Sequence, residues 1–158
     1  VLRVLPLLRE EFPEIKVLLA GAEPSRKVHL LAKANGVELK AGLEDIREAY
    51  GTGKIFFAPM LIGTGLQNKL LEAMAMEKPC VTSDLANKAL KADHGKNILV
   101  GECPEDYVKL ISELMRKPDL CRKLGANGRQ YVQENFSWKS SSNELEQLML
   151  AQSVQQVV

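Results

Sequence analysis

Three polar side chains in the middle of the chain have a spacing that would bring them together on one helix face. Thr64, Asn68 and Glu72 lie four residues apart, just after a loop that carries Gly63 and Gly65. At a helix start, unpaired N–H groups and the positive end of the helix dipole favour a phosphate. The Glu72 carboxylate, further along the same face, could accept hydrogen bonds from the paired hydroxyls of a ribose. These groups together predict a site for a nucleoside diphosphate.

The same residues also have a purely structural interpretation. Thr64 and Gln67 form the Thr-x-x-Gln pattern of a capping box, which is typical of a helix start. Glu72 could pair with Lys69, three residues earlier, on a solvated helix face. Spacing alone leaves both interpretations open.

The elements that must position these residues follow from the apolar pattern. Strands are expected at residues 15–20, 37–40, 54–58, 80–82 and 98–100, and helices at residues 5–12, 25–35, 43–50, 66–76, 87–91, 104–116 and 118–136. Strands that alternate with helices at short intervals predict an α/β fold with a parallel sheet. In such sheets, ligands bind beyond the carboxyl ends of the strands. Gly21 lies at this edge and could border a pyrophosphate, or it could belong to an ordinary strand-to-helix turn.

Length and composition describe one globular domain without a strong charge. The chain has 158 residues, 46% of them hydrophobic, and a formal net charge of +1, so no large field would draw it to nucleic acid. No apolar run approaches the ~20 residues of a membrane span. Cys80, Cys103 and Cys121 are odd in number and widely spaced, which argues against a disulfide framework and favours a reducing, cytoplasmic setting.

The sequence lacks the patterns that hold metals or cofactors. It contains no Asp-x-Asp, no histidine cluster, no cysteine pair and no Gly-Lys-Ser/Thr loop. The loop around Thr64 also lacks the third glycine of a dinucleotide fingerprint, which excludes NAD. We therefore expect neither a metal nor a cofactor.

The segment at residues 63–83, GTGLQNKLLEAMAMEKPCVTS, resembles the donor-binding segment of group 1 (family 4) glycosyltransferases of the GT-B fold. That family carries a glutamate, seven further residues, and then a second glutamate followed by Ala-Met-Ala and Pro-Val. The chain matches the second half, from Glu72 to Ala75 and from Pro79 to Val81. The Gln67-Asn68-Lys69 variant is similar to a bacterial subgroup linked to surface-polysaccharide assembly.

The resemblance implies that residues 1–150 form the Rossmann-like, carboxy-terminal half of a GT-B enzyme, followed by a tail at residues 151–158. It implies a nucleoside-diphosphate sugar as the donor, with the second glutamate on the ribose hydroxyls. Gly42 and Leu43 would meet the base through backbone groups, as the family's corresponding loop does. The implied donor-binding residues are Glu72, Thr64, Gly65, Leu66, Asn68, Gly21, Gly42 and Leu43.

The resemblance also implies parts that this chain does not include. An amino-terminal acceptor domain and the first strand of the donor domain would be missing, so we expect the piece alone to bind donors weakly and to transfer no sugar. The full-length protein would be a retaining enzyme of the cytoplasm, with a peripheral contact at the inner face of the membrane left open. Because the family's first glutamate falls at Thr64, a non-catalytic nucleotide-binding module and a nucleotide-sugar epimerase of similar fold are alternatives.

Overall fold

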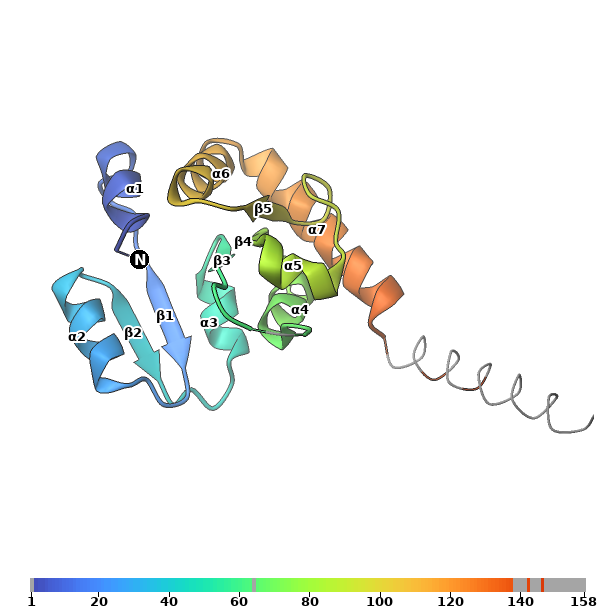
Figure 1. The fold of residues 1–158 in the computed structure, drawn as a ribbon, viewed down its shortest axis with the longest axis horizontal. Helices are drawn as coiled ribbons and strands as arrows, with labels where there is room; N and C mark the ends of the chain where they lie inside the picture. The colour runs from blue at the N-terminus through green and yellow to red at the C-terminus, as the bar shows by residue number, and fades with distance from the viewer. Residues whose placement is uncertain (1, 64, 138–141, 143–145, 147–158) are drawn as a thin grey trace, which may run out of the picture.

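Parallel strands form the framework of the molecule in the computed structural model, which describes residues 2–63, 65–137, 142 and 146 (Figure 1). β1 (Leu18–Gly21) pairs with β2 (Glu38–Ala41), and β3 (Phe56–Ala58), β4 (Cys80–Ser83) and β5 (Leu99–Gly101) form a second sheet in that order. Every pair of strands runs parallel. The predicted α/β class and the five predicted strands are confirmed, but the expected single sheet is divided into two.

Helices connect or follow these strands. In the described residues they are α1 (Leu5–Glu11), α2 (Arg26–Ala34), α3 (Arg47–Thr52), α4 (Asn68–Ala75), α5 (Asp84–Leu90), α6 (Pro104–Arg116) and α7 (Pro118–Asn135). The predicted start of α5 was three residues late, because the Ser83 hydroxyl caps the helix by accepting a hydrogen bond from the Ala86 N–H at 3.4 Å. Most of residues 138–150 and the expected tail at residues 151–158 lie outside the described part of the chain.

β4 is buried on both faces of the second sheet. All four of its residues are buried, and successive side chains face opposite sides. Cys80 packs in one cluster with Leu70 and Met74 of α4, whereas Val81 packs in another with Ile111 of α6. Burial on both faces is what a continuous apolar run predicts for a strand in a parallel sheet.

β1 and β3 each keep one edge that pairs with no other described strand. Figure 1 places β1 between β2 and β3, so the two free edges belong to neighbouring strands. α1 lies across both sheets: Leu5 packs with side chains of β1, β2 and α2, and Leu8 packs with side chains of β4, β5 and α6. Most residues of β1 and β3 are only partly buried, although strands inside parallel sheets are usually covered on both faces.

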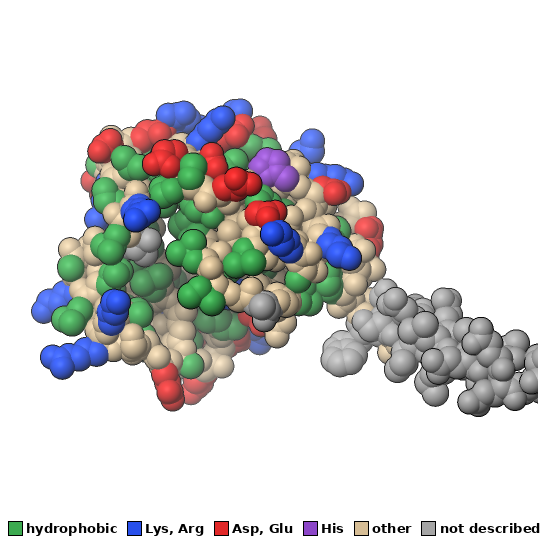
Figure 2. Space-filling model, in the orientation of Figure 1, with side chains coloured by type: hydrophobic (Ala, Val, Ile, Leu, Met, Phe, Trp, Pro, Cys, Tyr) green, Lys and Arg blue, Asp and Glu red, His purple; other side chains and the backbone are tan. Residues whose placement is uncertain are grey.

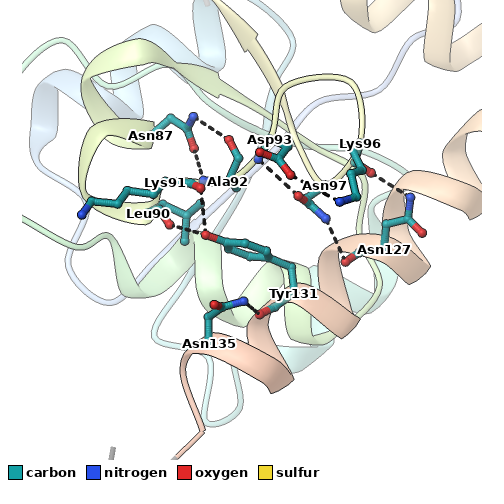
Figure 3. Close-up of polar contacts among 10 residues, drawn as sticks. All are labelled: Asn87, Leu90, Lys91, Ala92, Asp93, Lys96, Asn97, Asn127, Tyr131 and Asn135. Carbon is teal, nitrogen blue, oxygen red and sulfur yellow. Dashed lines mark hydrogen bonds and ion pairs between the residues drawn. The ribbon is translucent and has the colours of Figure 1, made fainter. Parts of the chain in front are cut away.

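A polar network ties α7 to the segment between α5 and β5 (Figure 3). The Tyr131 hydroxyl lies 2.8 Å from the carbonyl oxygen of Leu90 and 2.9 Å from that of Lys91. The Asn97 side chain, only 6% exposed, donates to the Asn127 carbonyl oxygen at 3.4 Å. These bonds satisfy carbonyl groups at the left-handed end of α5 and hold α7 against the second sheet.

Candidate functional site

Glu72 lies on the exposed face of α4. Leu70, Ala73 and Met74 point the opposite way and are fully buried against the sheet. Asn68, four residues before Glu72, is also exposed, so the two polar side chains share the outer face of the helix as predicted. The carboxylate is therefore accessible to a ligand, and it is not part of the core.

Tyr50, on the neighbouring helix α3, holds the Glu72 carboxylate. Its hydroxyl donates to Glu72 Oε2 at 2.8 Å and lies 3.3 Å from the Lys69 carbonyl oxygen. The structural interpretation allowed a pair with the Lys69 side chain; among the side-chain contacts of the described residues, the Glu72 carboxylate pairs instead with this phenol. Tyr50 was not predicted as a site residue, since its only signal in the sequence is an aromatic residue at the end of a short helix beside a strand.

The loop between β3 and α4 departs from the expected helix start. α4 begins at Asn68, with Gln67 in an extended conformation as its N-cap and no side-chain capping bond. Leu66, which the sequence places in the helix, therefore lies in the loop and is 40% exposed. Gly63 and Gly65 have φ values of 145° and 86°, so the chain needs further loop residues before it can turn into the helix. Thr64 lies outside the described residues.

A hydroxyl from β4 fixes the start of this loop. The Ser83 hydroxyl donates to the Met60 carbonyl oxygen at 2.7 Å, and its own oxygen accepts from the Ala86 N–H in the first turn of α5. The loop is thus anchored at the carboxyl end of the sheet. Gly65 and Leu66 remain exposed beyond that anchor, and the Gly65 carbonyl oxygen accepts from the Gln67 side chain at 3.3 Å.

Gly21 and Gly42 lie together at the carboxyl ends of β1 and β2. The Gly42 N–H donates to the Gly21 carbonyl oxygen at 3.1 Å, and Gly42 has a φ of 63°. A Cβ atom at either glycine would meet nothing within 4 Å, so both face open space. Leu43 follows and is half-buried. Among the described residues, no hydrogen bond joins this glycine pair directly to α4; α3, which follows β2, makes the connection through Tyr50.

Burial acts on the titration of two groups packed beside α4. It raises the pKa of the Cys80 thiol, whose side chain lies in the core. Burial and then the hydrogen bond to Glu72 raise the pKa of the Tyr50 phenol. Both groups therefore stay protonated in the folded chain at a pH where the unfolded chain loses their protons.

We expect the stability of the chain to fall as the pH rises above ~8.5, the ordinary pKa of a thiol, and more steeply above ~10, that of a phenol. In each pH window the unfolded state binds fewer protons than the folded state. The loss of the Cys80 proton in the unfolded state alone would lower the free energy of unfolding by up to about 1.4 kcal/mol per pH unit. Urea unfolding under reducing conditions from pH 7 to 10.5 measures this. Cys80→Ala should flatten the fall between pH 9 and 10, whereas Cys103→Ala, at a partly exposed site, should keep most of it. Equal slopes in Cys80→Ala and the unchanged chain would contradict the assignment.

The surface of the molecule carries charges of both signs (Figure 2). Figure 2 shows basic and acidic side chains interspersed over the face drawn.

The part of the chain that the structure describes contains no group of three or more His, Cys, Asp or Glu side chains arranged to hold a metal. Within the same residues, no helix combines the length and the apolar character that crossing a membrane requires.

Comparisons with known proteins agree with this arrangement. The family described as "Glycosyl transferases group 1" matches residues 1–117. Among curated proteins, the chain is 29% identical over 89 residues to "Glycosyltransferase 1 domain-containing protein 1" of Xenopus tropicalis, which covers 56% of this chain and 26% of that protein. The chain spans between about a quarter and somewhat more than a third of the curated relatives it matches.

Two solved structures show the same fold at low sequence identity. Anabaena Alr3699/HepE in complex with UDP superposes with a TM-score of 0.80 at 13% identity, over 94% of this chain and 44% of that one. The C-terminal domain of a group 1 glycosyl transferase (LpcC) from Francisella tularensis gives a TM-score of 0.71 at 15% identity, over 86% of this chain and 77% of that one. From the matched family, the parallel sheets and these neighbours, the chain belongs to the group 1 glycosyltransferases of the GT-B fold.

Proposed function

We propose that the chain is the donor-binding half of a glycosyltransferase that moves a sugar from a nucleoside diphosphate to an acceptor. The observation that carries this proposal is the exposed Glu72 carboxylate, which lies on the helix that follows the glycine loop. Tyr50 of α3 holds this carboxylate by a hydrogen bond. The Glu72 carboxylate would accept hydrogen bonds from the two ribose hydroxyls, and Asn68 would contact the sugar or the phosphates. The solved neighbour that was crystallised with UDP supports a nucleotide donor.

The diphosphate would lie against the loop that precedes α4. Backbone N–H groups of Thr64, Gly65 and Leu66 are assigned to it, and Gly21 borders it from β1. Gly42 and Leu43, at the end of β2, are assigned to the base. Fixed backbone dipoles aimed at the charge that grows on the leaving diphosphate can stabilise it. The proposal assigns no metal to this step, and it includes retention of the anomeric configuration.

A further strand is part of the proposal. The free edges of β1 and β3, and their partial burial, support one more parallel strand between them. We assign that strand, and an acceptor domain, to protein outside this chain. With that strand in place, the five strands would belong to one continuous sheet. Without the strand and the acceptor domain, donor binding would be weak and transfer absent.

The proposal includes a cellular setting. The three cysteines are unpaired, which fits a reducing compartment, so we place the enzyme in the cytoplasm of a bacterium. A contact of the full-length protein with the inner face of the membrane stays part of this proposal. The similarity to surface-polysaccharide transferases in the Gln67-Asn68-Lys69 segment supports a role in polysaccharide or glycoconjugate assembly.

Isothermal titration of the chain with UDP, GDP and ADP tests the proposal. We expect weak binding of at least one nucleotide, with a preference for one base, and no sugar transfer by the chain alone. Absence of binding to all three nucleotides at millimolar concentration would contradict the donor-site assignment.

Thr64 at the position of the family's first glutamate favours a second candidate, a nucleotide-binding module that transfers no sugar. The full-length protein separates the two candidates in assays across several donors. Binding without turnover would favour the non-catalytic module, and isomerisation of the donor without an acceptor would identify an epimerase.

A further inference from the structure

Tyr50 joins the core to the candidate ribose site. Its residue is only 8% exposed, and its ring packs edge-on against Phe56 of β3, with the ring centroids 5.4 Å apart. The hydroxyl reaches out of this packing to Glu72 Oε2 at 2.8 Å. A rigid aromatic side chain thus carries a donor to one oxygen of an otherwise exposed carboxylate.

The remaining acceptor capacity of Glu72 matches a pair of hydroxyls. An ionised carboxylate offers about four lone-pair positions on its two oxygens, and the phenol uses one of them. Oε1 and the other position on Oε2 remain for a ligand. Among the side-chain contacts of the described residues, the bond from Tyr50 is the one that the Glu72 carboxylate makes. A vicinal diol, with two adjacent O–H donors, fits this remainder.

A free glutamate side chain would have to be ordered when the ligand binds. Fixing a flexible side chain costs conformational entropy, and a binding partner that is ordered beforehand avoids that cost. Tyr50 is suited to this task because its own ring is fixed by the core. The raised pKa of its phenol keeps the proton in place as a donor.

We propose that Tyr50 is a positioning residue for the donor: it holds the Glu72 carboxylate in the orientation that receives the 2′ and 3′ hydroxyls of the ribose. This inference rests on the proposed function and adds to it a residue on a different helix, 22 positions earlier in the chain. Tyr50 itself does not touch the nucleotide; it acts through Glu72.

The test compares Tyr50→Phe with the unchanged chain in calorimetric titrations. The probes are the best-binding nucleotide among UDP, GDP and ADP and its 2′,3′-dideoxy analogue. Tyr50→Phe keeps the ring against Phe56 and removes only the hydroxyl. We expect it to weaken binding of the ribonucleotide by about three- to tenfold, the range for one hydrogen bond, and to leave binding of the dideoxy analogue unchanged. In a Glu72→Ala background, Tyr50→Phe should have no further effect.

Tyr131→Phe is the matched control, because it removes a tyrosine hydroxyl that bonds to the backbone carbonyl oxygens of Leu90 and Lys91 and not to Glu72. It should bind both nucleotides as the unchanged chain does. Unchanged ribonucleotide binding by Tyr50→Phe, or an equal loss for the dideoxy analogue, would overturn the positioning role and leave the donor site standing. If the unchanged chain binds no nucleotide, the proposed function and this inference both fail.

Discussion

Replacing Gly125 with alanine is expected to destabilise the chain by about 3 kcal/mol, the upper end of the usual range for overpacking a core. A Cβ atom at Gly125 of α7 would lie 2.2 Å from the Glu77 carbonyl oxygen and 2.9 Å from its carbonyl carbon. Both are backbone atoms, so no side-chain rotation can relieve the contact.

The turn that holds Glu77 cannot easily move away. Glu77 has a φ of 56°, and it ends α4 through two hydrogen bonds, from its own N–H to the Met74 carbonyl oxygen and from the Lys78 N–H to that of Ala73, each 3.0 Å long. Lys78 leads directly into Pro79 and the buried strand β4. α7 would have to shift instead, and with it the aromatic residues Tyr131 and Phe136, which pack against the α4 cluster.

Urea unfolding followed by circular dichroism measures the effect. Gly51→Ala is the matched control, because Gly51 also lies in a helix, α3, but a Cβ atom there would meet nothing within 4 Å. Alanine favours a helix over glycine by up to about 1 kcal/mol, so this control should be neutral or stabilising. Similar unfolding midpoints for the two variants would show that the contact between α7 and Glu77 is not tight.

The strands could be predicted from the sequence because their apolar runs are compact and bounded by glycine or proline. The run that begins at Cys80 is the clearest case: it predicts a buried strand, and all four residues of β4 are buried. The division of the sheet could not be predicted from these runs. Apolar pattern tells which residues form strands, but pairing depends on which other strand lies alongside, and β1 and β3 do not pair.

The start of α4 was missed for a local reason. Thr64 and Gln67 match a capping box, and this pattern favours a helix from Leu66. The backbone instead takes positive φ values at Gly63 and Gly65, and Gln67 becomes the N-cap without a side-chain bond. Glycine allows many conformations, so its presence does not predict which one the loop adopts.

The exposure of Glu72 follows from helical spacing, since the residues at the next positions form the apolar face of α4. Its partner does not follow from spacing. Tyr50 lies 22 residues earlier on another helix, and the contact arises only when α3 and α4 pack beside β3. Local pattern therefore identifies the candidate carboxylate, whereas the group that orients it becomes visible only in three dimensions.

Glu72→Ala is expected to weaken binding of the preferred nucleotide by about 10- to 150-fold, which corresponds to ~1.5–3 kcal/mol for hydrogen bonds to a charged group. Glu72→Gln should lose less than Glu72→Ala, because an amide keeps one carbonyl oxygen for a single hydroxyl. Calorimetric titration with UDP, GDP and ADP gives the affinities.

The fold should tolerate these changes, which makes the measurement a test of binding alone. Glu72 is exposed. When its carboxylate is removed, the Tyr50 hydroxyl can still donate a hydrogen bond to the Lys69 carbonyl oxygen, which lies 3.3 Å away. We therefore expect the unfolding free energy of Glu72→Ala to change by less than about 1 kcal/mol. Glu48→Ala removes an exposed carboxylate from α3 and is the matched control for the loss of charge. If Glu72→Ala binds as tightly as Glu48→Ala, the carboxylate does not hold the ribose, and the donor must lie elsewhere on the sheet edge.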